Sequence, residues 1–307
     1  MNKKAIALLS GGLDSLLAAK ITQEQGIKLI GVAFKSYFFD VSFAAQKQAQ
    51  ELNIPLKIID ISQAQFEKVL SPEYGYGTGL NPCVDCHLLM IKTAYQLMIK
   101  EGGDFLVTGE VLGQRPLSQN RQALDLIDRV ARIEGLVVRP LSAKLLPPTL
   151  PEKRGWLDQK KLLAICGRSR KEQLGLAKKF GLKNYTSPAG GCLLTDRVFS
   201  KRLSDLLGHF SAPSVAGLRL VRLGRHFWFN NTWVIVGRNN EENERIKKLI
   251  EKGDCLIELV GVPGPTTLVR GEINDQVIRR AKRLTKEYAP KAKGKKVKFV
   301  IKRGKGE

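Results

Sequence analysis

A short segment near the N-terminus carries residue types that suit phosphate chemistry. It lies between an apolar run at residues 5–9 and a helical pattern at residues 16–19, and it reads Ser10-Gly11-Gly12-Leu13-Asp14-Ser15. Adjacent glycines let the backbone approach an anion closely, and the N–H groups and dipole of a helix N-terminus favour negative charge. A Walker loop would carry a lysine after its glycines, whereas an aspartate beside phosphates suits magnesium coordination. We therefore expect a nucleotide and Mg²⁺ at Ser10, Gly11, Gly12, Asp14 and Ser15.

Three cysteines stand in settings that suit metal or sulfur chemistry. Cys83 and Cys86 form a CxxC pair before a helical segment at residues 87–100, and Cys192 lies on a glycine-rich loop. The helix dipole and free N–H groups are expected to lower the pKa of a thiol in the pair. Three thiols alone would leave a coordination position open, as a reactive centre needs, whereas His87 as a fourth ligand would make a structural zinc site.

A polar, glycine-punctuated segment follows a predicted strand at residues 104–108. It reads Thr108-Gly109-Glu110-Val111-Leu112-Gly113-Gln114-Arg115-Pro116-Leu117-Ser118-Gln119. Such a loop can hold a nucleotide or a substrate base, although an ordinary strand-to-helix connection has a similar composition. Ligands of parallel sheets bind beyond the carboxyl ends of the strands, so we expect this segment and residues 10–15 to face one crevice.

The order of the predicted elements indicates the fold class. Strands and helices alternate in the first part of the chain, with strands predicted at residues 28–34, 55–60, 104–108 and 136–138 and a helix at residues 44–52. Residues 145–155 are predicted to be a loop, residues 160–166 and 171–180 helical, and residues 181–191 another loop. We predict an α/β, parallel-sheet domain at residues 1–182, then a connecting segment at residues 183–212 that carries Cys192.

A smaller α+β domain is predicted at residues 213–307. Its expected strands are residues 218–223, 226–229, 232–236 and 256–260, and its expected helices are residues 241–252 and 275–288. This domain contains 22 Lys or Arg against 10 Asp or Glu and ends in a basic tail from Lys291. The tail suits phosphate contacts, although a solvated extension has the same composition. The rings and cations of residues 225–229 suit either base stacking or core packing.

Composition narrows the class of protein. The chain has 307 residues, 43% of them hydrophobic, and a net charge of +22, which favours a polyanionic partner. No apolar run is long enough for a membrane span and no leader cleavage site is evident, so a cytoplasmic protein without a membrane partner is expected. Five cysteines argue against a disulfide framework. Cys166 and Cys255 lie in apolar settings and are interpreted as buried structural thiols.

These motifs, in this order, resemble the PP-loop ATP pyrophosphatase domain of the tRNA 4-thiouridine synthetases. The resemblance rests on residues 10–15, on the CxxC pair before a helix, and on residues 108–119 followed by Arg139-Pro140-Leu141. Asn81-Pro82-Cys83 and Gly191-Cys192 also resemble the related tRNA 2-thiouridylases. The resemblance implies an adenine nucleotide alpha hydrolase-like fold and an enzyme, a tRNA sulfurtransferase. Such enzymes use ATP to adenylate a uridine carbonyl oxygen in tRNA and replace it with sulfur, giving 4-thiouridine or 2-thiouridine.

The resemblance also implies roles for individual residues. Asp14, Cys83, Cys86 and Cys192 would be catalytic, and ATP with magnesium would bind Ser10, Gly11, Gly12, Asp14, Ser15, Gly109 and Glu110. Substrate contacts would come from Gln114, Arg115, Gln119, Arg170 and Lys171. The family carries a lysine at the start of its late helix, where this chain reads Ser169-Arg170-Lys171.

Two sulfur routes remain open from the resemblance. Cys83, Cys86 and Cys192 look like the three ligands of a [4Fe-4S] cluster whose fourth iron is open to sulfide. Alternatively, Cys192 would carry a persulfide with one CxxC thiol as its partner. The sulfur donor, a cysteine desulfurase or free sulfide, and a homodimeric state are both left open.

The C-terminal third weakly resembles the RNA-binding domain of the NFACT group. The matching stretches are Gly224-Arg225-His226-Phe227, residues 236–243 and Gly261-Val262-Pro263-Gly264-Pro265. Two other functions stay open. One is a PP-loop enzyme that adenylates a small-molecule acceptor for sulfur or nitrogen transfer, and the other is a non-catalytic RNA-binding protein.

Overall fold

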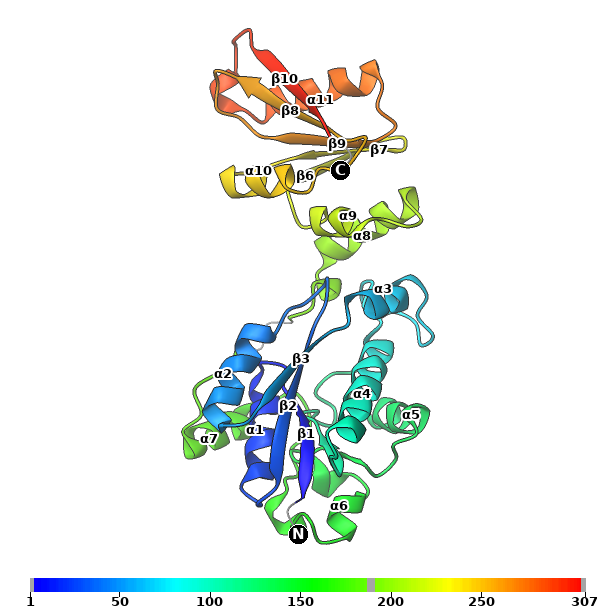
Figure 1. Ribbon diagram of the computed structural model, residues 1–307, viewed down its shortest axis with the longest axis vertical. Coiled ribbons are helices and arrows are strands. Elements are labelled where there is room, and N and C mark those ends of the chain that lie inside the picture. The colour runs from blue at the N-terminus through cyan, green and yellow to red at the C-terminus, as the bar shows by residue number, and fades with distance from the viewer. Residues whose placement is uncertain (1–2, 187–190, 305–307) are drawn as a thin grey trace. The chain divides into compact units, whose positions relative to one another are not determined.

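The computed structural model describes residues 3–186 and 191–304 and divides the chain into two compact units (Figure 1). The first unit comprises Met1–Asp196 and the second Arg197–Glu307. The segment at residues 183–212 is therefore shared: Cys192 lies with the first unit, and the helix that begins at Arg197 opens the second.

A five-stranded, fully parallel sheet forms the centre of the first unit. Its strand order is β3-β2-β1-β4-β5, so the chain starts in the middle of the sheet and builds outward on both sides. The strands are β1 (Lys4–Leu8), β2 (Lys28–Lys35), β3 (Leu56–Asp60), β4 (Phe105–Val107) and β5 (Val137–Val138). Almost every side chain of β1, β2 and β4 is buried, as expected for a parallel sheet that is covered on both faces.

Helices cover both faces of this sheet (Figure 1). On one face lie α1 (Leu13–Gln23), α2 (Ser42–Leu52) and α7 (Lys171–Phe180), whose apolar residues share a core with Ala5, Ala7 and Val107. On the other lie α4 (Cys83–Lys100) and α5 (Arg121–Ala131), which pack around Ile6 and Leu106. The remaining helices, α3 (Ser62–Leu70) and α6 (Leu150–Lys153), are short. The predicted α/β fold with a parallel sheet is confirmed.

Two local predictions in this unit are wrong. Residues 160–166 contain only the 3-10 turn η2 (Gln159–Lys161), because Leu162 and Ile165 enter the core from an extended stretch. Residues 145–155 are more ordered than a loop, since Thr149 and Glu152 form a capping box that starts α6.

The second unit is built on a five-stranded antiparallel sheet. Its order is β10-β8-β9-β7-β6, which leaves β10 and β6 at the two edges. The strands are β6 (Arg225–Phe229), β7 (Thr232–Val236), β8 (Cys255–Val260), β9 (Thr267–Gly271) and β10 (Lys298–Arg303). The helices are α8 (Arg197–His209), α9 (Val215–Leu220), α10 (Asn240–Lys247) and α11 (Asp275–Glu287). The predicted smaller α+β domain is confirmed.

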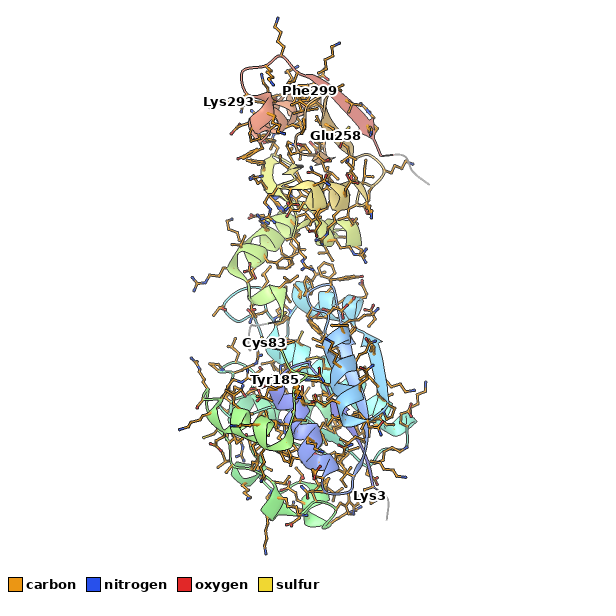
Figure 2. The ribbon with its side chains drawn as sticks, turned by 90° about the vertical axis from the view of Figure 1, so that its left-hand side faces the viewer. Lys3, Cys83, Tyr185, Glu258, Lys293 and Phe299 are labelled. Atoms are coloured by element: carbon orange, nitrogen blue, oxygen red, sulfur yellow. The ribbon has the colours of Figure 1, made fainter. Side chains whose placement is uncertain are left out.

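Part of the predicted basic tail, residues 298–303, forms an edge strand of this sheet. Residues 298–303 pair with β8 along their whole length, and Phe299 packs on the core of the unit (Figure 2). The predicted strand at residues 218–223 is also wrong, because the Ser214 hydroxyl accepts from the Gly217 N–H and caps helix α9 there.

Among the described helices, none combines the length and apolar character needed to cross a bilayer.

Gly109→Ala is expected to destabilise the first unit. The added Cβ would lie 2.3 Å from the Ser15 nitrogen and 2.5 Å from the Asp14 carbonyl carbon, so the start of α1 would have to move. Overpacking of this kind costs about 1–3 kcal/mol.

Gly175→Ala in α7 is the matched control, because its added Cβ would have no neighbour within 4 Å and alanine favours helices by about 0.5–1 kcal/mol. Calorimetry should show a lower unfolding temperature for Gly109→Ala only. Equal temperatures for the two variants would contradict the close packing.

Candidate active site

The glycine loop joins β1 to α1 in the predicted strand, turn and helix arrangement. Gly11 has a φ of +75°, and a Cβ at this position would lie 2.6 Å from that of Ala44, so glycine is required twice over. The Ser15 hydroxyl accepts from the Ser10 N–H at 3.1 Å and donates to the Gly12 carbonyl at 3.0 Å. The two predicted serines therefore shape the loop around the N-terminus of α1.

Three predicted residues from distant segments meet at this helix start. The Gln114 amide donates to Asp14 Oδ2 at 2.9 Å, and the Arg170 guanidinium lies 3.8 Å from the same oxygen. Within the described residues, Asp14 Oδ1, Gln114 Oε1 and Arg170 Nε are buried without a hydrogen-bond partner. Because buried polar atoms are normally paired, these groups are suited to receive a polar ligand. Lys171, the first residue of α7, is exposed and no contact joins it to this group.

Asp14 also fits the expected magnesium ion chemically. Its unpartnered Oδ1 is a carboxylate oxygen, the ligand that hard cations prefer, and phosphates or waters commonly supply the other ligands. In the described part of the chain, no three His, Cys, Asp or Glu side chains come close enough to hold an ion by themselves.

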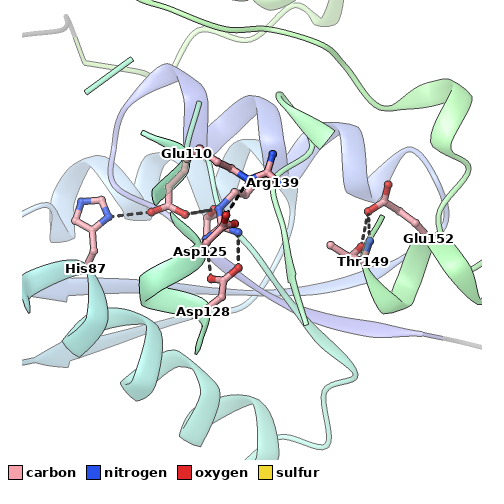
Figure 3. A network of polar contacts seen from close by, with 9 residues as sticks. His87, Glu110, Asp125, Asp128, Arg139, Thr149 and Glu152 are labelled. Carbon is pink, nitrogen blue, oxygen red and sulfur yellow. Dashed lines mark hydrogen bonds and ion pairs between the residues drawn. The ribbon is translucent and has the colours of Figure 1, made fainter. Parts of the chain in front are cut away.

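Glu110 is buried in a network of charges behind the glycine loop (Figure 3). Its carboxylate accepts hydrogen bonds from Arg139 at 2.8 Å and from Thr108 at 3.0 Å, and it contacts His87 Nδ1 at 2.9 Å. Burial raises its pKa, but Arg139 and His87 more than reverse this and hold the pKa at about 2. Arg139 also forms a two-pronged pair with Asp128, at 2.8 Å for each bond. Both carboxylate oxygens of Glu110 thus have polar partners, and these contacts fix the start of the 108–119 loop.

The CxxC thiols lie in the first turn of α4, where amide groups contact both of them. The Gln65 side chain donates to Cys86 Sγ at 2.7 Å, and Asn81 donates to Cys83 Sγ at 3.2 Å. The expected lowering of the thiol pKa is wrong for Cys86: burial raises its pKa to about 12, which outweighs the helix N-terminus. Asp85, between the two, is buried and anchors the preceding loop through the N–H groups of Glu73 and Tyr74.

Cys192 lies close enough to the pair for electrostatic interaction. The pKa of Cys86 is raised by Cys192 and Cys83 in addition to burial. The half-buried Cys192 is held beside the C-terminal end of β2, because the Leu193 N–H donates to the Phe38 carbonyl at 3.0 Å. Ser187, Pro188, Ala189 and Gly190, which complete its predicted loop, lie outside the described residues. Cys192 is therefore within electrostatic range of Cys83 and Cys86, while the three thiols do not form a single-ion site among the described residues.

Cys166, Cys255 and His87 do not belong to the group of three thiols. Cys255 is buried as predicted, but Cys166 is exposed, because the neighbouring Ile165 takes the core position. His87 engages Glu110 instead of completing a zinc site with the thiols.

The 108–119 loop links the glycine loop to the thiols. Gln114 reaches Asp14, whereas Arg115, one residue later, is exposed and lowers the pKa of Cys192 against the stronger effect of burial. Gln119 is buried inside the loop, where its carbonyl accepts from the Gly113 N–H. The glycine loop and the 108–119 loop follow the carboxyl ends of β1 and β4, and Figure 2 shows Cys83 at the end of the first unit opposite Lys3.

Some residues at this rim are not apparent from the sequence. Gln48 is fully buried and donates to the Gly12 carbonyl at 2.9 Å, and Thr186 donates to the Gly11 carbonyl from both its N–H and its hydroxyl. Gln65, which donates to Cys86, is another rim residue that the sequence does not reveal. Single glutamines and threonines carry no spacing pattern, so only the fold reveals them.

One group of exposed basic residues in the second unit lies on α11 and at the C-terminal edge. It comprises Arg279, Arg280, Arg283, Lys291, Lys293, Lys295, Lys296, Lys298, Lys302 and Arg303. Lys302 has a carboxylate nearby, Glu258 at 3.5 Å. The rest have no ion-pair partner among the described residues, which leaves a strongly positive surface.

Known proteins show similarity to both units. Residues 1–144 match the family described as "Thiamine biosynthesis protein (ThiI)", and residues 224–307 match "NFACT protein RNA binding domain". The tRNA-specific 2-thiouridylase MnmA of Sulfurimonas denitrificans is 33% identical over 125 residues, which is 36% of each chain. MnmA 1 of Clostridium tetani is 27% identical over 199 residues, 60% of this chain and 51% of that protein. The chain thus spans between about a third and a half of the length of these relatives.

A solved structure of a 4-thiouridine synthetase with RNA and bound ATP is also similar. It covers 66% of this chain and 50% of its own, at 17% identity and a TM-score of 0.42. The first unit is thus similar to the ThiI family and to tRNA-specific 2-thiouridylases, and the second unit is similar to the NFACT RNA-binding domain.

Proposed function

We propose that this protein is an ATP-dependent tRNA sulfurtransferase, which adenylates a uridine carbonyl oxygen and replaces it with sulfur. The 108–119 loop carries the proposal, because Gln114 contacts Asp14 and the adjacent Arg115 acts on Cys192. A phosphate loop and a thiol group thus share one rim of the sheet. The similarity to tRNA-modifying relatives supports the same reaction class.

The glycine loop would hold the phosphates of ATP. The N–H groups at the start of α1 and the helix dipole attract anions, and Gly11 and Gly12 allow close approach. The Arg170 guanidinium adds a positive charge, which compensates for the lysine of the family pattern. Magnesium bound at Asp14 would shield the phosphate charges.

Adenylation makes the uridine oxygen a leaving group. That oxygen attacks the α-phosphorus of ATP and pyrophosphate leaves, so the oxygen is carried as an ester of AMP. Sulfur then attacks the same carbon and AMP departs with the oxygen. Arg170 and the N-terminus of α1 would stabilise the negative charge that develops in the first step.

The three thiols would hold the sulfur-delivering centre, and we favour a [4Fe-4S] cluster. Cys83, Cys86 and Cys192 would bind three irons and leave the fourth for sulfide. The three residues would hold the cluster through thiolate sulfurs, the ligand type that iron–sulfur clusters take. The amide hydrogen bonds from Gln65 and Asn81 favour this route, because such bonds stabilise thiolate ligands.

The persulfide route remains the alternative. The terminal sulfur on Cys192 would attack the activated carbon and displace AMP, forming a disulfide between Cys192 and the nucleoside. A CxxC thiolate would then attack Cys192 Sγ, which releases the thiouridine and leaves a protein disulfide. In this route a cysteine desulfurase would transfer persulfide sulfur to the Cys192 thiolate, and an external thiol would reduce the protein disulfide after each turnover; free sulfide would suit the cluster route only.

The second unit supports tRNA as the acceptor over a small molecule. Its positive surface on α11 and β10 matches the charge of an RNA backbone, and its family match is to an RNA-binding domain. A small-molecule acceptor would leave this unit without a role.

Asp14→Asn is expected to lower AMP formation by about 100-fold or more, because a charge that acts on the developing transition state is lost. AMP and pyrophosphate are measured with unmodified tRNA, and thiouridine is measured by nucleoside mass spectrometry. Asp125→Asn, which removes an exposed carboxylate of the same unit, is the control and should retain activity. Wild-type AMP formation by Asp14→Asn would remove this residue from the site.

Cys192→Ser is expected to abolish thiouridine formation while ATP binding persists, since both sulfur routes need this thiol. Cys166→Ser makes the same chemical change at an exposed thiol and should be silent. Anaerobic reconstitution with iron and sulfide separates the routes: about four irons per wild-type chain indicate the cluster. A chain that stays free of iron yet thiolates tRNA would establish the persulfide route, and thiouridine made by Cys192→Ser would exclude both.

A further inference from the structure

A groove of about 640 Å³ lies within the second unit beside β6, an edge strand of its sheet. Helix α8 contributes one wall through Arg197, Lys201 and Arg202. The strand and the end of α11 contribute Arg225, Phe227 and Tyr288. Basic and aromatic side chains therefore share one hollow surface.

The groove is positively charged. Four cationic side chains line it against a single carboxylate, Asp205, which is paired with Lys201 at 3.2 Å. Neither Arg197 nor Arg225 has an ion-pair partner among the described residues. His226 adds no charge at neutral pH, because burial and the nearby Arg202 lower its pKa to about 4. An anionic ligand is favoured.

The aromatic rings that line the groove differ in how they are packed. Trp228 stacks on His209, with ring centroids 3.9 Å apart, and on Trp233 in parallel planes, so it joins α8 to the sheet. Phe227 and Tyr288 are half-buried, with centroids 5.9 Å apart, and Arg225 lies 4.5 Å from the Tyr288 ring. Phe227 and Tyr288 pack on the core of the unit and also line the groove, whereas the groove-lining Trp228 is already stacked on His209 and Trp233.

The strand itself adds hydrogen-bonding groups. β6 pairs with β7 as the outermost strand of its sheet. Alternate residues of an outer antiparallel strand direct their N–H and C=O groups away from the neighbouring strand. Such groups can bind the edges of unpaired bases, which a duplex keeps paired.

We propose that the β6 groove binds a single-stranded segment of RNA, with phosphates on Arg197 and Lys201 and a base against Phe227 and Tyr288. The combination of a basic groove and aromatic rings is the general means by which proteins hold unpaired nucleotides. This site rests on the proposed function, in which the bound RNA is the tRNA substrate. A peptide strand could also add to β6, but four cations in the groove favour a phosphate backbone.

The test measures binding of a fluorescent ten-nucleotide oligouridine, and of an RNA duplex, to the full chain by anisotropy over a salt series. Arg197→Gln/Lys201→Gln is expected to weaken single-strand binding about tenfold. Each phosphate contact with a single strand contributes about 0.7 to the salt slope, so the slope should fall by about 1.4. The control, Arg245→Gln/Lys252→Gln, removes the same charge from exposed positions outside the groove and should leave both values unchanged.

Tyr288→Leu tests the ring separately, since it keeps apolar packing but removes the stacking face. Single-strand affinity should fall about fivefold or more with no change in the salt slope. Wild-type single-strand binding by both groove variants would overturn the proposal, as would an equal loss of duplex binding. The proposal would also be overturned if the chain bound an acidic peptide in this groove and did not bind oligouridine. AMP formation by the wild-type chain is measured in parallel. Failure of the groove proposal is thereby distinguished from failure of the proposed sulfurtransferase activity.

Discussion

The buried carboxylate of Glu110 is the interaction on which the arrangement of the rim depends. It follows β4 directly and is bound by Arg139 beyond β5 and by His87 in α4, so three separate segments converge on one charge. An isolated buried carboxylate would be very unfavourable, and removing one partner of such a pair typically costs about 3–5 kcal/mol. The network therefore fixes where the 108–119 loop begins, and with it the positions of Gln114 and Arg115.

Close backbone packing also fixes the position of the glycine loop. Gly109 lies directly against the backbone of Asp14 and Ser15, with no space for a side chain, and Gly11 packs in the same way against Ala44. The region thereby brings main-chain donors near one another and leaves polar atoms of Asp14, Gln114 and Arg170 without partners. Unsatisfied groups of this kind lower stability. Arg170 Nε beside the helix N-terminus can donate to an anion, whereas Asp14 Oδ1 and Gln114 Oε1 are acceptors that suit a cation or a donor.

Much of this fold could be predicted from the chain, for physical reasons that also explain the failures. Long buried strands such as β2 have nearly continuous apolar runs, and α11 has a strongly one-sided pattern, so both were predictable. β10 was missed because its lysines hide the alternate packing of Phe299, and α9 because the cap at Ser214 outweighs an apolar run that also suits a strand. The convergence of the three thiols came from the family resemblance, since no local pattern relates residue 86 to residue 192. The amide groups of Gln48 and Gln65 and the partners of Glu110 depend on tertiary contacts alone.

The two hydrogen bonds from Thr186 to the Gly11 carbonyl have a consequence for the order of events at the rim. They attach the chain just before the Cys192 loop to the same peptide that shapes the phosphate loop, and Leu193 is attached to the end of β2 on the other side. Any rearrangement of Gly11 on filling or emptying the phosphate loop must therefore stretch or break a contact of the thiol-bearing segment. Under the proposed function, a nucleotide that moved Gly11 would also act on the segment that leads to Cys192, through these two hydrogen bonds.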